Sequence, residues 1–111
     1  MSSTKIRQLK TIYSLEERKV SIELLNYTKL NQQYQEAELQ YKQLIDYRKE
    51  YYQYVSVENE QKFQAATLQT YYRFIDKLNH AIQEQAQKVR GAKSMASEGF
   101  KLYLKAKQKA E

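Results

Sequence analysis

A seven-residue spacing of apolar side chains runs through most of this chain. Counted from Ile6, six successive members of the spacing are apolar or aromatic before Arg48 interrupts it, and a second series that starts at Leu68 is apolar at all seven positions. The two series are Ile6, Tyr13, Val20, Tyr27, Tyr34 and Tyr41, and Leu68, Ile75, Ile82, Val89, Ala96, Tyr103 and Ala110. Such spacing is typical of helices that supercoil around a partner helix. Proline is absent and only Gly91 and Gly99 are glycines, so the sequence predicts an all-α fold of long helices.

The two series are out of register, because Leu68 lies 62 positions after Ile6, which is not a multiple of seven. The change falls in a segment with two β-branched valines, where Ser56 and Asn59 are candidate N-cap residues. We therefore expect one helix near 4–54, a turn near 55–59 and a second helix near 60–109, in a single domain that spans 1–111. Two helices of similar length with a short connection favour an antiparallel coiled-coil hairpin. One continuous helix that dimerises is the alternative.

Each predicted helix has more apolar surface near the turn than one line of contact with its partner can bury. We assign Tyr41, Ile45, Tyr52 and Val55 to the contact line of the first helix, and Leu68, Tyr72, Ile75, Ile82, Ala86 and Val89 to that of the second. A flanking stripe lies about 100° further round each helix. Its members are Gln40, Leu44, Tyr47 and Tyr51 on the first helix, and Tyr71, Phe74, Leu78, Ala81 and Gln85 on the second.

In an antiparallel pair, rotations of the same sense bring both flanking stripes to the same side of the hairpin. They would form one apolar face, and a monomeric protein rarely exposes such an aromatic patch without a partner for it. Burying several of these side chains would supply most of the driving force for an interface. Two other interpretations remain: the stripes widen the contact between the two helices, or they mediate self-association.

The residue inventory argues against an enzyme. There is no cysteine, and His80 is the only histidine, so a catalytic triad or a zinc site would depend on a single residue. A glycine-rich phosphate loop is also missing. We expect no catalytic residue, no metal and no cofactor. No apolar run approaches the roughly 20 residues that span a bilayer, and the first residues do not resemble a secretory signal, which together predict a cytoplasmic protein.

The net charge of +6 is concentrated late in the chain. Residues 85–110 include seven basic side chains against one acidic residue, Glu98. This surface could face nucleic acid, an anionic membrane, an acidic protein or solvent. Nucleic-acid platforms interleave aromatic and basic residues, whereas here seven of the eleven tyrosines lie between Tyr41 and Tyr72, away from the lysines. The separation argues against binding of nucleic acid.

Two segments resemble the flagellar type III export protein family FliJ. The first is Ala37-Glu-Leu-Gln-Tyr-Lys-Gln-Leu-Ile-Asp-Tyr-Arg-Lys-Glu-Tyr51, and the second is Tyr71-Tyr-Arg-Phe-Ile-Asp-Lys-Leu-Asn-His-Ala-Ile82. Both align without a shift across a connection of similar size, and together they cover about a third of the chain. Before Tyr34 the likeness is one of pattern only.

The resemblance implies a non-enzymatic component of bacterial flagellum biogenesis, and hence of motility. Members are antiparallel helical hairpins similar to the central stalk of rotary ATPases. They are understood to sit in the pore of the hexameric export ATPase, to engage the cytoplasmic domain of the membrane export gate and to handle substrate chaperones. The resemblance therefore implies peripheral association with the inner face of the cell membrane through these partners.

The resemblance also assigns residues to the gate. Carried over position by position, the gate-binding residues fall on Gln40, Leu44, Tyr47, Tyr51, Phe74, Leu78, Ala81 and Gln85, which the spacing had already placed on the flanking stripes. For the ATPase ring we expect contacts from the paired termini, with Lys101, Lys105 and Lys109 spaced four apart.

Two alternatives to this function stay open at the level of sequence: a self-associating structural coiled coil, and the stalk protein of a virulence-type type III secretion system. Family members usually continue beyond the position of Glu111, where the heptads of this chain are still running. That difference leaves open a further C-terminal binding element.

Overall fold

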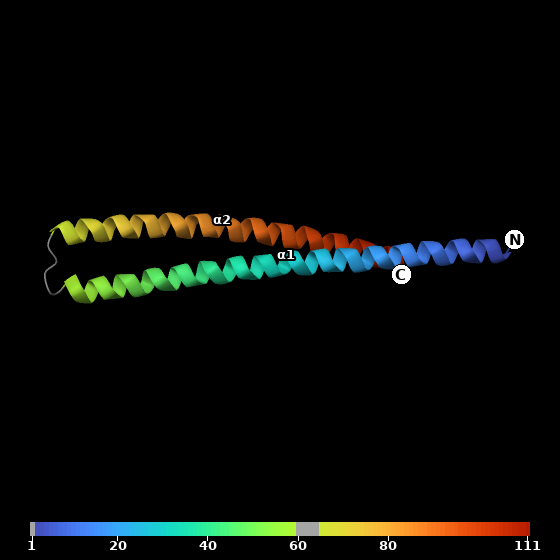
Figure 1. The fold of residues 1–111 in the computed structure, drawn as a ribbon, viewed down its shortest axis with the longest axis horizontal. Helices are drawn as coiled ribbons and strands as arrows, with labels where there is room; N and C mark the ends of the chain where they lie inside the picture. The colour runs from blue at the N-terminus through green and yellow to red at the C-terminus, as the bar shows by residue number, and fades with distance from the viewer. Residues whose placement is uncertain (1, 60–64) are drawn as a thin grey trace. The chain divides into compact units, whose positions relative to one another are not determined.

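Two long helices make up the described part of the chain in a computed structural model, which describes residues 2–59 and 65–111, and side chains at 2–56 and 67–111. Helix α1 spans Ser2–Asn59 and helix α2 spans Ala65–Ala110. Figure 1 shows the two helices, with the connection drawn in grey. The predicted all-α, antiparallel two-helix hairpin is confirmed.

The structure contradicts the predicted turn at 55–59. Residues 55–59 are helical and belong to α1, and Val55 is buried. Helix propensity is a weak preference that packing overrides, so the β-branched Val55 and the candidate cap Ser56 lie within α1, and the candidate cap Asn59 is its last residue. The predicted start of the second helix, at residue 60, lies outside the described residues.

The chain divides into two compact units, Gln35–Gly91 and Met1–Tyr34 with Ala92–Glu111. In the unit of residues 35–91, buried or half-buried side chains of each helix recur at alternating spacings of three and four, with further half-buried residues such as Ile45 and Phe74 beside them. The recurring residues are Ala37, Tyr41, Leu44, Arg48, Tyr51 and Val55 on α1, and Leu68, Tyr71, Ile75, Leu78, Ile82, Gln85 and Val89 on α2. This is the pattern that a coiled coil requires, in which two positions of every seven face the partner helix.

In the unit of residues 1–34 with 92–111, the contact line of α2 is made mostly of small residues. Ala92, Ala96, Gly99, Ala106 and Ala110 recur there, with Tyr103 as the exception. A Cβ added at Gly99 would lie 2.9 Å from Leu30 Cδ1 and 3.5 Å from Tyr27 Cα. The small residues therefore let the backbone of α2 approach the large side chains of α1 closely.

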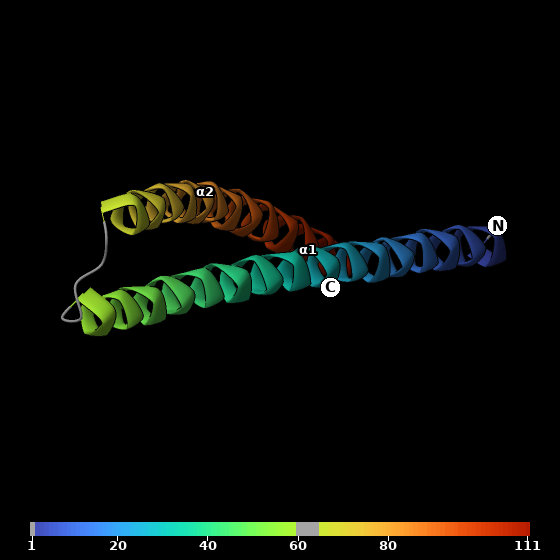
Figure 2. The same cartoon turned by 60° about the vertical axis from the view of Figure 1, so that its left-hand side comes forward.

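Residues 2–15 of α1 have no side chain that is even half-buried. In both Figure 1 and Figure 2 this N-terminal part, in blue, continues past the end of α2 within its unit. Ile6, Leu9 and Tyr13 continue the heptad spacing there, and each is more than half exposed. Their exposure follows from the absence of an α2 residue beside them.

Candidate partner-binding surface

An aromatic cluster joins the two helices in the unit of residues 35–91. The Phe74 ring lies 4.5 Å from that of Tyr51 and 6.1 Å from that of Tyr47, measured between centroids. Tyr51 also stacks on Tyr71 at 5.2 Å, with the ring planes only 15° apart. These separations are in the range at which aromatic pairs attract, each by about 0.5–1.5 kcal/mol beyond the area that they bury. We call Tyr47, Tyr51, Tyr71 and Phe74 the aromatic cluster.

The contact between Tyr47 and Phe74 shows that residues flanking the two contact lines meet on one side of this unit, whereas Tyr51 and Tyr71, predicted on the same stripes, lie on the contact lines themselves. Tyr47 directly precedes the contact position Arg48, and Phe74 directly precedes the contact position Ile75. Positions that precede equivalent contact positions face each other in an antiparallel pair, because both helices are rotated in the same sense. Tyr47 is 48% exposed, and the other three rings are half-buried, so the cluster has an outer surface.

Two residues of the predicted site are inside the hairpin. Leu78 and Gln85 are only 7% and 8% exposed, and the expectation that they lie beside the contact line is wrong. The contact line of α2 takes the residue three positions after each heptad member, which gives Tyr71, Leu78 and Gln85. The heptad pattern predicted the residue four positions after it, such as Tyr72, yet Tyr72 is 60% exposed.

The remaining members of the predicted site differ in exposure. Gln40 is exposed on α1 like Tyr47, whereas Leu44 and Ala81 are half-buried. Nε2 of Gln85 donates hydrogen bonds to the carbonyl oxygen of Ala37 at 3.0 Å and to Oε1 of Gln40 at 3.2 Å. The structure therefore brings all eight residues to neighbouring positions of one unit, six of them with accessible surface and two as the interior on which the six rest.

A second polar contact crosses the same unit. Nη1 of Arg48 donates to Oδ1 of Asn79 at 2.9 Å. Arg48 occupies the contact position at which the heptad of α1 turns polar, and this bond gives one of the five N–H donors of its guanidinium an acceptor on α2. Together with the Gln85 contacts, it fixes which residues of α1 and α2 stand opposite each other, since a shift along the helix would leave both side chains without these partners.

The predicted ATPase-facing lysines belong to the other unit. Lys101, Lys105 and Lys109 are all exposed on α2, and Nζ of Lys101 lies 3.6 Å from Oε1 of Glu98. An exposed pair of this kind contributes little to stability. The lysines are thus accessible cations on a helix surface.

Sequence reasoning missed a depression in the unit that contains the termini. Tyr27 and Tyr34 of α1 and Ala96 and Phe100 of α2 are among its lining residues. The sequence feature that could have revealed it is the presence of tyrosines on the contact line of α1 where the contact line of α2 has alanine. Across residues 2–59 and 65–111, no group of three or more acidic or histidine side chains is placed to hold a metal ion, and no helix has the length and apolar character needed to cross a membrane.

The chain matches the family described as flagellar FliJ protein over residues 4–111. It belongs to the FliJ family. No curated protein and no solved structure shows significant similarity to it. The match includes both segments whose resemblance was noted in the sequence, and it extends the likeness to the region before Tyr34. Membership makes the chain a flagellar, export-related protein.

Proposed function

We propose that this FliJ-family chain couples the flagellar export ATPase ring to the membrane export gate without catalysing a reaction itself. The aromatic cluster, with Gln40 and Leu44 beside it, forms the contact with the cytoplasmic domain of the gate protein. Lys101, Lys105 and Lys109 contact the ATPase hexamer, which binds the ATP. The protein acts in the cytoplasm at the inner face of the membrane, where its partners hold it, and it also receives substrate chaperones.

The observation that carries this proposal is the convergence of four aromatic rings from two helices on one partly exposed side. Tyrosine supplies a large contact area and a polar tip, which suits a surface that alternates between water and a partner. The separation of the cluster and the lysines into different units supports a protein with two docking regions.

A pull-down of the export ATPase and of the gate cytoplasmic domain tests both contacts. We expect the variant with Tyr47→Ala and Phe74→Ala to lose the gate domain and to keep the ATPase. Charge reversal of the three lysines to glutamate should have the opposite effect. Tyr54→Ala is the matched control, because Tyr54 is an exposed tyrosine of the same unit that lies outside the aromatic cluster; it should bind both partners normally.

The outcome that would exclude the gate contact is equal loss, or equal retention, of both partners by the Tyr47 and Phe74 variant. Leu78 and Gln85 need a different experiment, because they are buried and their substitution changes the packing between the helices. Light scattering over a range of concentrations addresses the structural alternative. A stable dimer that depends on Tyr47 and Phe74 would mean that a second copy of the chain covers the cluster.

A further inference from the structure

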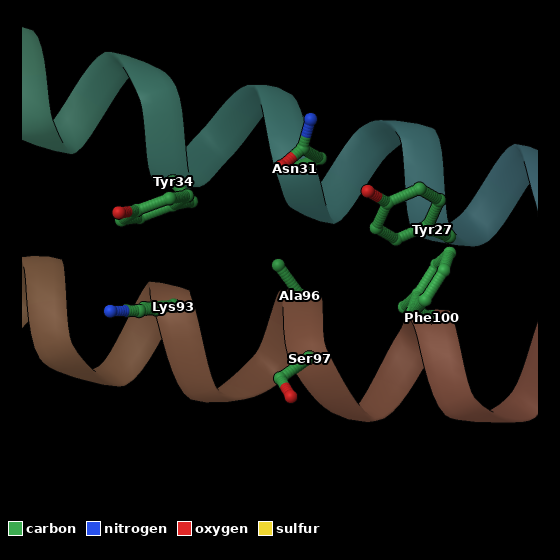
Figure 3. Close-up of a pocket in the computed structure, with 7 residues that line it drawn as sticks. All are labelled: Tyr27, Asn31, Tyr34, Lys93, Ala96, Ser97 and Phe100. Carbon is green, nitrogen blue, oxygen red and sulfur yellow. The ribbon is translucent and has the colours of Figure 1, made fainter.

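A depression lies between α1 and α2 in the unit of residues 1–34 with 92–111. Its volume is about 220 Å³, and it is lined by Tyr27, Asn31, Tyr34, Lys93, Ala96, Ser97 and Phe100. Figure 3 shows the Ala96 methyl directed toward α1, with Tyr27 and Phe100 at one end and Tyr34 and Lys93 at the other. The surface therefore has an apolar centre and a cation at one edge.

The depression exists because the two contact lines differ in side-chain size. Ala96 is 5% exposed and occupies a contact position opposite the tyrosines of α1, where a larger side chain would fill the space. The ring centroids of Tyr27 and Phe100 are 5.2 Å apart, which holds that wall in place. The site is thus built from side chains that packing already orients.

The size of the depression selects the kind of occupant. Small-molecule sites usually enclose about 300–1,000 Å³, so 220 Å³ is suited to a protein side chain and not to a cofactor. Its lining includes no acidic residue, and Lys93 makes no ion pair with any described carboxylate. An apolar side chain with a carboxylate close to it would satisfy both features.

Exposed apolar residues and a further lysine lie next to the depression. Leu24 lies one heptad before Asn31, and Phe100 lies one heptad after Lys93, so each pair shares a helix face. Leu24, Phe100 and Leu104 are all exposed apolar residues. Lys107 follows Phe100 by a further heptad, so the exposed apolar residues of α2 have a lysine on either side along the helix.

We propose that this depression is a docking site for an acidic amphipathic helix of another protein. One apolar side chain of that helix packs on Ala96, between the Tyr27–Phe100 pair and Tyr34, and its carboxylates meet Lys93 and Lys107. The choice of occupant rests on charge complementarity, since Lys93 lines the depression, Lys107 lies two heptads after it on α2, and no acidic residue is among the lining residues. A nucleic acid would need several cations at the site, whereas a single lysine lines it. The proposal uses neither the aromatic cluster nor Lys101, Lys105 and Lys109, and so it is independent of the proposed gate and ATPase contacts.

Binding of a synthetic amphipathic helical peptide to the full chain tests the proposal. The probe has leucine on one face and glutamate on the other, and its counterpart has lysine in place of glutamate. We expect the acidic peptide alone to bind, and to shift the backbone amide signals of Asn31, Lys93 and Ser97 in a nuclear magnetic resonance titration. Lys93→Glu and Phe100→Ala should each weaken binding about fivefold or more, in keeping with the loss of one charged or aromatic contact.

Lys105→Glu is the matched control, since it makes the same charge change at an exposed position of the same unit that does not line the depression. It should alter the affinity by less than about twofold. Circular dichroism of each variant verifies that the helices persist. Equal weakening by Lys93→Glu and Lys105→Glu would overturn the proposal in favour of general charge attraction.

Other results would replace the proposed occupant. Equal binding of the acidic and the basic peptide would remove the role of Lys93. Dimerisation of the chain that Phe100→Ala abolishes would assign the depression to a second copy. Binding to vesicles of anionic lipid, lost in Lys93→Glu and with no binding of the acidic peptide, would assign it to a membrane surface.

Discussion

At the scale of single residues, the two glycines occupy different environments although both lie in the interior of α2. A Cβ at Gly91 would meet no atom within 4 Å, whereas a Cβ at Gly99 would lie 2.9 Å from Leu30 Cδ1. Glycine in a helix interior is less favourable than alanine by about 0.5–1 kcal/mol. Gly91 therefore weakens the helix with no packing gain, and Gly99 permits a close helix approach.

We expect Gly91→Ala to raise the free energy of unfolding by about 0.5–1 kcal/mol. Gly99→Ala should give a smaller gain, because Leu30 has to move its terminal methyl group away. Gly99→Leu should destabilise by about 1–3 kcal/mol, since the added side chain overfills the contact. Urea denaturation followed by circular dichroism measures all three. A larger gain from Gly99→Ala than from Gly91→Ala would contradict the close approach at Leu30.

The pKa of Tyr71, one of the four residues of the aromatic cluster, is raised. Burial raises the pKa of Tyr71 above the ordinary value of 10.0, and the neighbouring Tyr52, Tyr51 and Tyr72 add to the effect. Because the folded state disfavours the phenolate, the contribution of Tyr71 to stability is complete below pH 10 and is lost as the pH rises through its folded pKa.

We therefore expect Tyr71→Phe to reduce the loss of stability between neutral pH and pH values above about 10. Parallel urea denaturation at the two pH values measures this difference. Tyr54→Phe serves as the control, because it removes the same hydroxyl group at an exposed position of the same unit. An identical alkaline loss in the wild type and in Tyr71→Phe would show that Tyr71 does not titrate late.

At the scale of the helices, the sequence predicted one of the two contact positions in each heptad correctly. The series from Ile6 and from Leu68 both lie on the observed contact lines wherever the two helices meet. The other position was wrong on both helices, because Tyr51 and Tyr52 on α1 are equally aromatic, as are Tyr71 and Tyr72 on α2, yet Tyr52 and Tyr72 are the exposed members of each pair. Gln85 is moreover a polar residue in an apolar line. The seven-residue period alone does not show whether the second contact position lies three or four residues after the first. Packing against the partner helix determines which of the two is buried.

The same element suggests a test of how the two helices are aligned. We expect Gln85→Leu to stabilise the chain by about 1 kcal/mol through added apolar burial. The substitution leaves no buried group without a partner, because the Ala37 carbonyl also accepts a bond within its helix and Gln40 is exposed. Gln83→Leu, at an exposed position, should change stability by less than about 0.5 kcal/mol.

Gln85→Leu should also allow α1 and α2 to pair in more than one register, since a buried polar residue specifies register at a cost in stability. Doubled amide signals for Ala37 and Gln40 in Gln85→Leu would report this loss. A lower free energy of unfolding in Gln85→Leu than in the wild type would mean that the bonds from Gln85 contribute more than burial of the replacement leucine.

At the scale of the whole molecule, the heptads predicted the helical hairpin, and the segments 37–51 and 71–82 predicted the family. The FliJ match confirms the resemblance. The exact turn and the burial of Leu78 and Gln85 could not be predicted, since they depend on how two long helices pair. The lysines and the aromatic cluster were both identifiable by spacing, because exposed chemistry on a regular helix repeats with its turns.

The exposed start of α1 leads to a prediction about the whole chain. Removal of residues 2–12 should change the urea midpoint little, with a stability difference below about 0.5 kcal/mol, because none of these side chains is even half-buried. Removal of 104–111 should lower the midpoint, since it deletes the buried Ala106 and shortens the contact line. Comparable losses from both deletions would show that the start of α1 packs against part of the chain.

The small-residue contact line of α2 has a mechanical consequence. The contact line of residues 92–110 consists mostly of alanine and glycine, so few large side chains oppose a shift of this segment along α1. A shift within residues 35–91 must instead break the hydrogen bonds of Gln85 and Arg48 and separate the four rings of the aromatic cluster. Under a force applied along the helices, slippage would begin in the unit that contains the termini. In the unit of residues 35–91, the same force would be resisted by the hydrogen bonds of Gln85 and Arg48 and by the contacts of the aromatic cluster.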